Sequence, residues 1–95
     1  MTICTVTATF EPIPEYRDEV RKLLLEQAEI VRTEPGCEYY DLYDHVNGNL
    51  VFIEAWTTRQ HWVSHNDAPT VQAINEGVLG KLLSPVLVSE LYKAN

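Results

Sequence analysis

Apolar and polar residues alternate along four stretches of the chain, a pattern typical of β-strands. Pro12 and Pro14 end the first stretch because proline cannot donate to a strand ladder. Asn47-Gly48-Asn49 separates the second and third stretches and predicts a hairpin turn. The pattern therefore predicts four strands, at residues 3–10, 37–46, 50–57 and 86–93.

Apolar residues recur every three or four positions in two further regions, which predicts amphipathic helices. The first helix is expected over residues 14–34, where Glu34-Pro35-Gly36 ends it. After the third strand, Thr57 or Thr58 can cap a short helix that runs to Asn66. Beyond Pro69 a second helical stripe is expected to continue to about residue 83.

The predicted order is β-α-β-β-α-β, which is the ferredoxin-like arrangement of an α+β fold with a four-stranded antiparallel sheet. Both faces of the strands carry apolar residues, for example Phe52 and Trp56 on one side and Val51 and Ile53 on the other. The helices can cover only one face. Because a bare apolar face of this size marks an interface, we expect a homodimer in which two sheets pack face to face.

Composition narrows the class of protein. A chain of 95 residues is expected to form a single domain, 1–95. Seven basic against 14 acidic residues give a net charge of −7, which argues against nucleic acid and against an anionic membrane surface as partners. The sequence has no apolar run of the roughly 20 residues that span a bilayer. With only two cysteines and no signal-peptide pattern, we expect a reducing, cytoplasmic location.

Few residues are suited to chemistry, because the sequence lacks a phosphate-binding glycine loop, a Cys-x-x-Cys pair and a nucleophile elbow. His61 and His65 share a helix face, yet Trp62 stands where a zinc-protease motif needs Glu. A third ligand would have to come from elsewhere in the chain, so we predict no metal site. Two interpretations remain. The histidines are exposed or cap a helix, or one of them, His65, acts as an acid or base in a pocket.

Glu54 is unusual because it lies in mid-strand between Phe52 and Trp56, where a charge is costly unless paired. Either an arginine such as Arg59 or Arg32 neutralises it, or it is a pocket carboxylate. Several aromatic residues are expected to form core or interface, with a flat pocket for an aromatic ligand as the functional alternative. They are Tyr39, Tyr40, Tyr43, Trp56, Trp62 and Tyr92.

Five short motifs, in order and spacing, make the chain resemble the antibiotic biosynthesis monooxygenase family, which includes small quinol monooxygenases. The motifs are Val20-Arg21-Lys22-Leu23-Leu24-Leu25, Glu34-Pro35-Gly36-Cys37, Tyr40-Asp41-Leu42-Tyr43, Glu54-Ala55-Trp56 and the helical His65. The resemblance implies a dimeric α+β barrel. It also implies oxygenation of a quinol or polycyclic phenol by dioxygen without a cofactor, because an electron-rich phenolate can itself reduce dioxygen.

On this resemblance His65 is the candidate base and Glu54 its orienting or charge-balancing partner. The candidate substrate contacts are Trp56, Trp62, Tyr43 and Asn66. The chain departs from the family pattern after His65, where Ala68 and Thr70 replace a Ser and a second His. The positions matching the haem-degrading relatives' triad read Thr5 or Thr7, His65 and Asn75, so haem degradation is not expected.

Two other functions stay open at this stage. The same fold with a single base could act as an isomerase that abstracts a proton beside a carbonyl. Its polar, often phosphorylated substrate would require basic residues in the pocket, and most of the arginines lie on the first helix. A non-catalytic dimeric ligand-binding module is the other alternative, because fold alone does not fix function.

Overall fold

The four predicted strands form one antiparallel sheet with the order β2-β3-β1-β4. The computed structural model of the protein describes residues 2–95, so the first residue of the predicted domain lies outside the described residues. The strands are β1 (Cys4–Phe10), β2 (Cys37–Asp44), β3 (Leu50–Trp56) and β4 (Leu87–Leu91). The predicted hairpin joins β2 to β3, and the side chain of Asn47 accepts the backbone N–H of Asn49 inside its turn. The ferredoxin-like α+β architecture is confirmed.

The helical segments are η1 (Pro14–Tyr16), α1 (Arg17–Val31), α2 (Arg59–Asn66) and α3 (Pro69–Gly77). Thr58 caps α2, because its side-chain oxygen accepts the backbone N–H of His61. The first helix differs from the prediction at both ends, since it begins with a 3₁₀ turn and α1 ends three residues before Glu34.

The prediction that the last helix continues to about residue 83 was wrong. After Gly77 the backbone leaves the helix and hydrogen-bonds to the segment that follows β1. The N–H of Leu83 donates to the carbonyl of Glu11 over 2.7 Å, and the carbonyl of Lys81 accepts the N–H of Ile13 over 2.9 Å. These long-range bonds replace helical ones that two glycines had already weakened.

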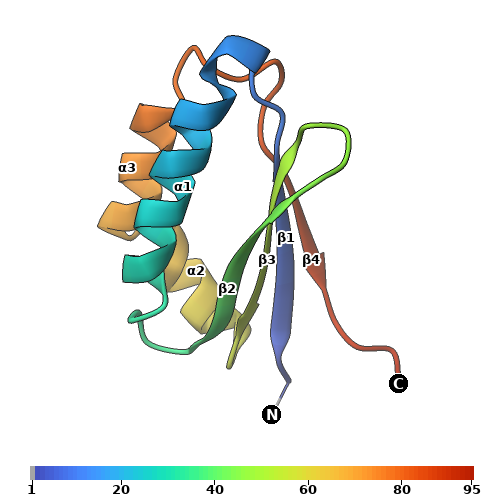
Figure 1. The fold of residues 1–95 in the computed structure, drawn as a ribbon. Coiled ribbons are helices and arrows are strands. Elements are labelled where there is room, and N and C mark those ends of the chain that lie inside the picture. The colour runs from blue at the N-terminus through green and yellow to red at the C-terminus, as the bar shows by residue number, and fades with distance from the viewer. Residues whose placement is uncertain (1) are drawn as a thin grey trace.

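All helices lie on one face of the sheet, as Figure 1 shows. Strand alternation sends Val6, Phe52 and Trp56 toward the helices, where α1 contributes Leu24 and Val31 to the same core. Glu54 follows the alternation and points into this layer. The buried polar residues Glu54, His65 and Thr70 come from β3, α2 and α3. A site is therefore expected between the sheet and these two helices.

The opposite face of the sheet is uncovered in the single chain and keeps its apolar side chains partly exposed. Register places Thr7 at its centre, between Ile53 of β3 and Ser89 of β4. Around them are Ile3, Tyr39, Tyr43, Leu87 and Leu91, each at least 40% exposed. We call this surface the outer sheet face.

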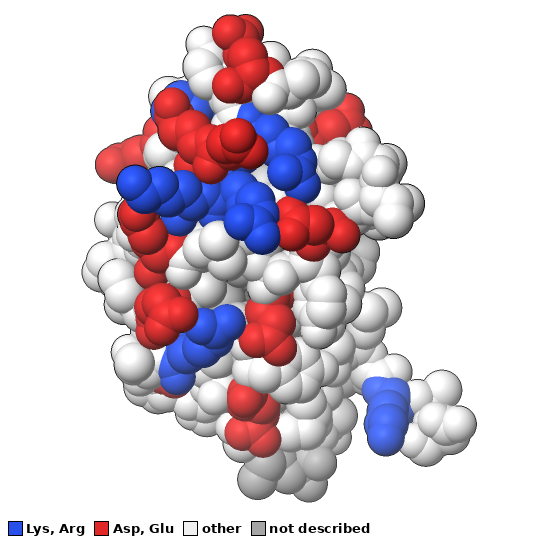
Figure 2. Space-filling model, in the orientation of Figure 1, with Lys and Arg blue, Asp and Glu red and all other residues white. Residues whose placement is uncertain are grey.

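Surface charges tie α1 to the β2–β3 hairpin. Arg17 and Arg21 both contact the carboxylate of Asp44 at 2.9 Å. Hydrogen bonds from Arg21 and then Arg17 lower the pKa of Asp44 to about 2. Figure 2 shows acidic and basic side chains interspersed over the helical layer. Among the described residues, no helix is long and apolar enough to cross a membrane.

Candidate active site

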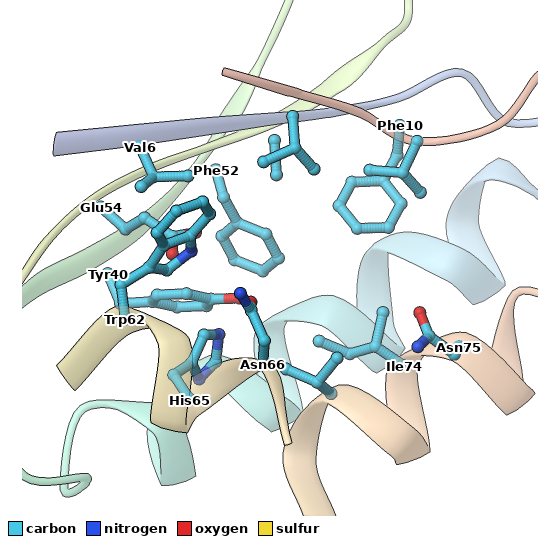
Figure 3. A pocket seen from close by; sticks show the side chains of 14 residues that line it. Val6, Phe10, Tyr40, Phe52, Glu54, Trp62, His65, Asn66, Ile74 and Asn75 are labelled. Atoms are coloured by element: carbon cyan, nitrogen blue, oxygen red, sulfur yellow. The ribbon is translucent and has the colours of Figure 1, made fainter. Parts of the chain in front are cut away.

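A cavity of about 140 Å³ lies between the helix-facing side of the sheet and helices α2 and α3. Its walls are mostly apolar, and Figure 3 shows them together with the polar side chains that point inward. The polar residues in the wall are Tyr40, Glu54, Trp62, His65, Asn66 and Asn75. An apolar cleft with a few convergent polar groups is the usual form of a small-molecule site.

Within residues 2–95, the three buried polar residues of the pocket wall each have one polar atom without a protein partner. These atoms are the hydroxyl of Tyr40, Oε2 of Glu54 and Nε2 of His65. In the same residues, every side-chain nitrogen or oxygen that is itself sealed from solvent has a hydrogen-bond partner. The three atoms therefore reach the cavity, where a ligand or water can satisfy them.

His65 is held rigidly. Its Nδ1 lies 2.7 Å from Oε1 of Glu34, and Thr70 donates to the other oxygen of Glu34 over 2.6 Å. Trp56 stacks on the imidazole at 4.6 Å between ring centroids, and Tyr40 meets it edge-on at 5.5 Å. The ring is thus fixed on its two sides and at Nδ1, which leaves Nε2 for the pocket.

Burial sets the charge state of this histidine. The loss of water lowers the pKa of His65, and the hydrogen bond and charge of Glu34 oppose part of that effect. The imidazole is therefore neutral at neutral pH. A neutral imidazole with its proton on Nδ1 would donate to Glu34 and leave the lone pair of Nε2 for the cavity, which is the state a general base requires.

Within residues 2–95, Glu54 has no arginine partner, so the first of its two interpretations was wrong. Arg59 instead bonds Glu90 at 2.8 Å, while Arg32 bonds Glu29 and Asp41. These partners lie at the surface, where arginine stays hydrated, whereas Glu54 is only 2% exposed.

Burial raises the pKa of Glu54 to about 7; the hydrogen bond from the indole N–H of Trp56 lowers it, and the charge of Glu34 raises it. Glu54 is accordingly the pocket carboxyl of the second interpretation. Glu54 was predicted to orient His65, but Glu34 is the residue that contacts the His65 ring.

Two of the four candidate substrate contacts line the cavity, and two do not. Trp62 and Asn66 line the cavity, and the guanidinium of Arg59 lies 5.7 Å from the Trp62 ring centroid. Trp56 lies behind His65 in the core, with none of its surface exposed. Tyr43 pairs with Val51 on the outer sheet face, so strand alternation turns it away from this cavity.

The sequence interpretation did not assign a site role to Tyr40, which lines the cavity, or to Glu34, which contacts His65 from behind. Tyr40 could have been found, because alternation along β2 places it on the face opposite Tyr43. Glu34 could not, because it is 31 residues from His65 and only the packing of α2 on the loop after α1 brings them together.

His61 does not join His65 in a ligand cluster. Its Nδ1 lies 2.8 Å from the hydroxyl of Thr58, in the cap of α2. Residues 2–95 contain no group of three His, Cys, Asp or Glu side chains placed to hold a metal ion.

Comparison with known proteins places this arrangement in a family. Residues 3–77 match the sequence model of the family described as antibiotic biosynthesis monooxygenase. The chain is 34% identical over 87 residues to "Putative monooxygenase Rv0793" of Mycobacterium tuberculosis. The aligned residues cover 90% of this chain and 86% of the relative.

Solved structures agree with this assignment. The structure of Rv0793 superposes with a TM-score of 0.91 at 32% identity, covering 98% of this chain and 96% of that one. PA3566 from Pseudomonas aeruginosa shares the fold, with a TM-score of 0.89 at 24% identity over 100% of this chain and 97% of its own. The chain therefore belongs to the antibiotic biosynthesis monooxygenase family.

Proposed function

We propose that this protein is a monooxygenase that oxidises a quinol or a related phenol with dioxygen, without a cofactor. The observation that carries the proposal is His65, a buried neutral imidazole whose Nδ1 is held by Glu34 and whose Nε2 faces an aromatic-lined cavity. Family membership supports oxygenation as the reaction class. The isolated base supports a reaction that begins with removal of a hydroxyl proton.

The first step moves the hydroxyl proton of the substrate to Nε2 of His65. The O–H electron pair stays on the substrate oxygen, and the resulting phenolate is electron-rich enough to reduce dioxygen. For a quinol, one oxygen atom joins a ring carbon and the other leaves as water, which carries the two hydrogen atoms that the substrate loses. All the electrons come from the substrate, so the protein supplies a base, proximity and a dry pocket.

Pocket size limits the substrate. A cavity of roughly 150 Å³ holds one benzene molecule, and this cavity measures about 140 Å³. One aromatic ring therefore fits inside, with its hydroxyl at His65. A larger polycyclic phenol would have to extend past Asn66, which is exposed at the edge of the pocket.

Pocket charge argues against the isomerase alternative. None of the described residues that line the cavity is Lys or Arg, and Glu54 adds a carboxyl group. A phosphorylated substrate would meet no counter-charge there. An uncharged ligand suits this lining. Below about pH 7, the value to which the pKa of Glu54 is raised, the protonated Glu54 can donate a hydrogen bond to the second oxygen of a quinol.

We further propose that the active form is a homodimer. The outer sheet face supports this, because Tyr39, Tyr43, Leu87 and Leu91 are large apolar residues that are between 42% and 66% exposed. A contiguous apolar patch on a small protein is usually an interface. Packing of two such faces would also bury Tyr43.

Oxygen uptake tests the activity. Purified protein, treated with chelator and shown to be free of flavin and haem, is given a panel of benzoquinols, naphthoquinols and anthrones against a blank without enzyme. Wild type should consume oxygen above the blank. His65→Ala and His65→Gln should each lose at least about 100-fold in kcat, the scale of general-base catalysis.

The matched control is His45→Ala, in the exposed hairpin, which should retain wild-type turnover. Full turnover in both His65 variants would refute His65 as the base. No uptake by wild type on any compound would refute the proposed activity, and ligand binding without turnover would then favour the non-catalytic module.

A further inference from the structure

His65 separates two openings. One side of the residue lines the ligand cavity, and the other lines a hollow on the far side of α2. We call this second opening the rear hollow; its other residues are Glu34, Pro35, His61, Ser64 and Ala68. Glu34 belongs to the rear hollow and does not line the ligand cavity. It therefore acts on a ligand only through His65.

The loop that carries Glu34 is fixed to the start of α2. The carbonyl of Gly36 accepts hydrogen bonds from the backbone N–H of Thr57 at 2.8 Å and from its hydroxyl at 3.2 Å. Gly36 also packs so closely on His61 that an added Cβ would lie 2.2 Å from Cγ of that ring. The position of Glu34 relative to α2 is thus set by backbone contacts.

The carboxylate of Glu34 has both oxygens engaged. One faces Nδ1 of His65 at 2.7 Å and the other accepts from Thr70 at 2.6 Å. Thr70 is itself 5% exposed, and Glu34 has no Lys or Arg partner among the described residues. The negative charge of Glu34 is therefore directed at the imidazole and is not neutralised elsewhere.

The other titratable groups around His65 are Tyr40 from β2, Glu54 from β3 and His61 from α2, which shares the rear hollow. Burial raises the pKa of Tyr40, so that phenol stays neutral. Glu54 lies across the ligand cavity, whereas Glu34 touches the ring. Of the acidic groups around the imidazole within residues 2–95, only Glu34 lies within hydrogen-bonding distance of a ring nitrogen.

We propose that Glu34 is the positioning residue for His65. It holds the imidazole as the Nδ1–H tautomer, so that the Nε2 lone pair faces the ligand. It also stabilises the imidazolium that forms when the ligand's hydroxyl proton moves to Nε2. The second role rests on the proposed function of the cavity. The logic is that of any base oriented by a carboxylate on its other nitrogen.

Nitrogen NMR of the imidazole tests the tautomer and the charge coupling without any substrate. The chain has three histidines, and loss of one signal in His65→Gln assigns that of His65. In wild type, His65 should carry its proton on Nδ1. In Glu34→Gln, the amide oxygen can still accept that proton, so the tautomer should persist while the pKa of His65 falls.

The matched control is Glu38→Gln, which removes the same charge at an exposed position of β2 and should leave the pKa of His65 unchanged. An Nε2–H tautomer in wild type would overturn the proposal, as would an unchanged pKa of His65 in Glu34→Gln. If Glu34→Gln fails to fold, Thr70→Val serves instead: it frees one oxygen of Glu34 and should alter the His65 titration in a folded protein.

Kinetics tests the second role. Glu34→Gln should lower kcat by roughly 10- to 100-fold, the usual cost of losing such an orienting partner, with little change in KM. Glu34→Asp should recover part of kcat because it restores the charge. Unchanged kcat in Glu34→Gln would overturn the charge-balancing role. If wild type itself turns over no substrate, the proposed function fails, and the NMR result still decides whether Glu34 sets the state of His65.

Discussion

Trp56 donates its indole N–H to Oε1 of Glu54 across 3.0 Å, within the core. The same indole stacks on His65, so one aromatic side chain connects the two ionisable groups of the pocket. Burial raises the pKa of Glu54 to about 7 and lowers the pKa of His65 below its ordinary value, so both groups favour their neutral forms.

Glu54 should make stability depend on pH. Burial raises the pKa of Glu54 to about 7 in the folded protein from 4.5. The folded state then binds the proton more tightly, so this stabilisation is complete below the unfolded pKa and is lost as pH rises through 7. The full shift corresponds to roughly 3 kcal/mol. Urea unfolding at several pH values measures this effect. Relative to wild type, the unfolding free energy of Glu54→Gln should rise by roughly 3 kcal/mol between acid and neutral pH. A constant difference between the two proteins would contradict the prediction.

The rate of the proposed reaction should be bell-shaped in pH. His65 must be neutral to act as a base, and burial lowers the pKa of His65 below 6.5, which sets the acid limb. Glu54 must be protonated to donate to the second substrate oxygen, which sets the basic limb at about 7. The profile of kcat/KM should therefore peak slightly below neutral pH. Glu54→Gln should lose the basic limb and keep the acid one; a basic limb that persists in this variant belongs to another group.

Tyr40 and Tyr43 provide a matched pair of substitutions on one strand. The Tyr40 hydroxyl reaches the cavity, whereas Tyr43 lies on the outer sheet face. Tyr40→Phe should weaken substrate binding by about tenfold, the value of one hydrogen bond, with unfolding free energy within about 1 kcal/mol of wild type. Tyr43→Phe should leave binding unchanged. Isothermal titration with a non-reactive analogue measures both, and equal effects would place the pocket elsewhere.

Gly36 should be far less replaceable than Gly48. Both have positive φ, 79° and 97°, so alanine strains the backbone at each by roughly 1–2 kcal/mol. At Gly48 an added Cβ meets nothing within 4 Å, whereas at Gly36 it meets the ring of His61 at 2.2 Å. Gly36→Ala should therefore lower the unfolding free energy by more than Gly48→Ala does. It should also disturb the His65 signal, because the loop carries Glu34. Equal destabilisation would mean that the loop moves freely.

A charge in the centre of the outer sheet face should separate the proposed dimer. Thr7 lies between Ile53 and Ser89 on that face, and Thr7→Lys would place an ammonium group in an apolar interface. Sedimentation velocity should then give a monomer, while Gln72→Lys on the exposed side of α3 stays dimeric. A monomeric wild type at micromolar concentration would refute the homodimer.

Sequence alone was enough for the architecture. Period-two alternation, the Asn47-Gly48-Asn49 turn and the helical stripe of α1 are local signals, and each fixed its element to within a few residues. Alternation also separated the faces of the sheet, which correctly left an apolar outer face. The last helix was too long because its end depends on hydrogen bonds to Glu11 and Ile13, which are distant in sequence.

Only part of the site could be predicted from the sequence. His65 and Glu54 stood out as ionisable residues in apolar surroundings, and both line the cavity. Their hydrogen-bond partners could not be predicted from the sequence, because a buried carboxyl group accepts whichever donor the packing brings near. Trp56 meets Glu54 two residues along the strand, where an arginine had been expected, and Glu34 reaches His65 across 31 positions. Neighbouring residues in the sequence determine which side chains are buried, whereas the contact between Glu34 and His65 forms only when the loop after α1 packs against α2.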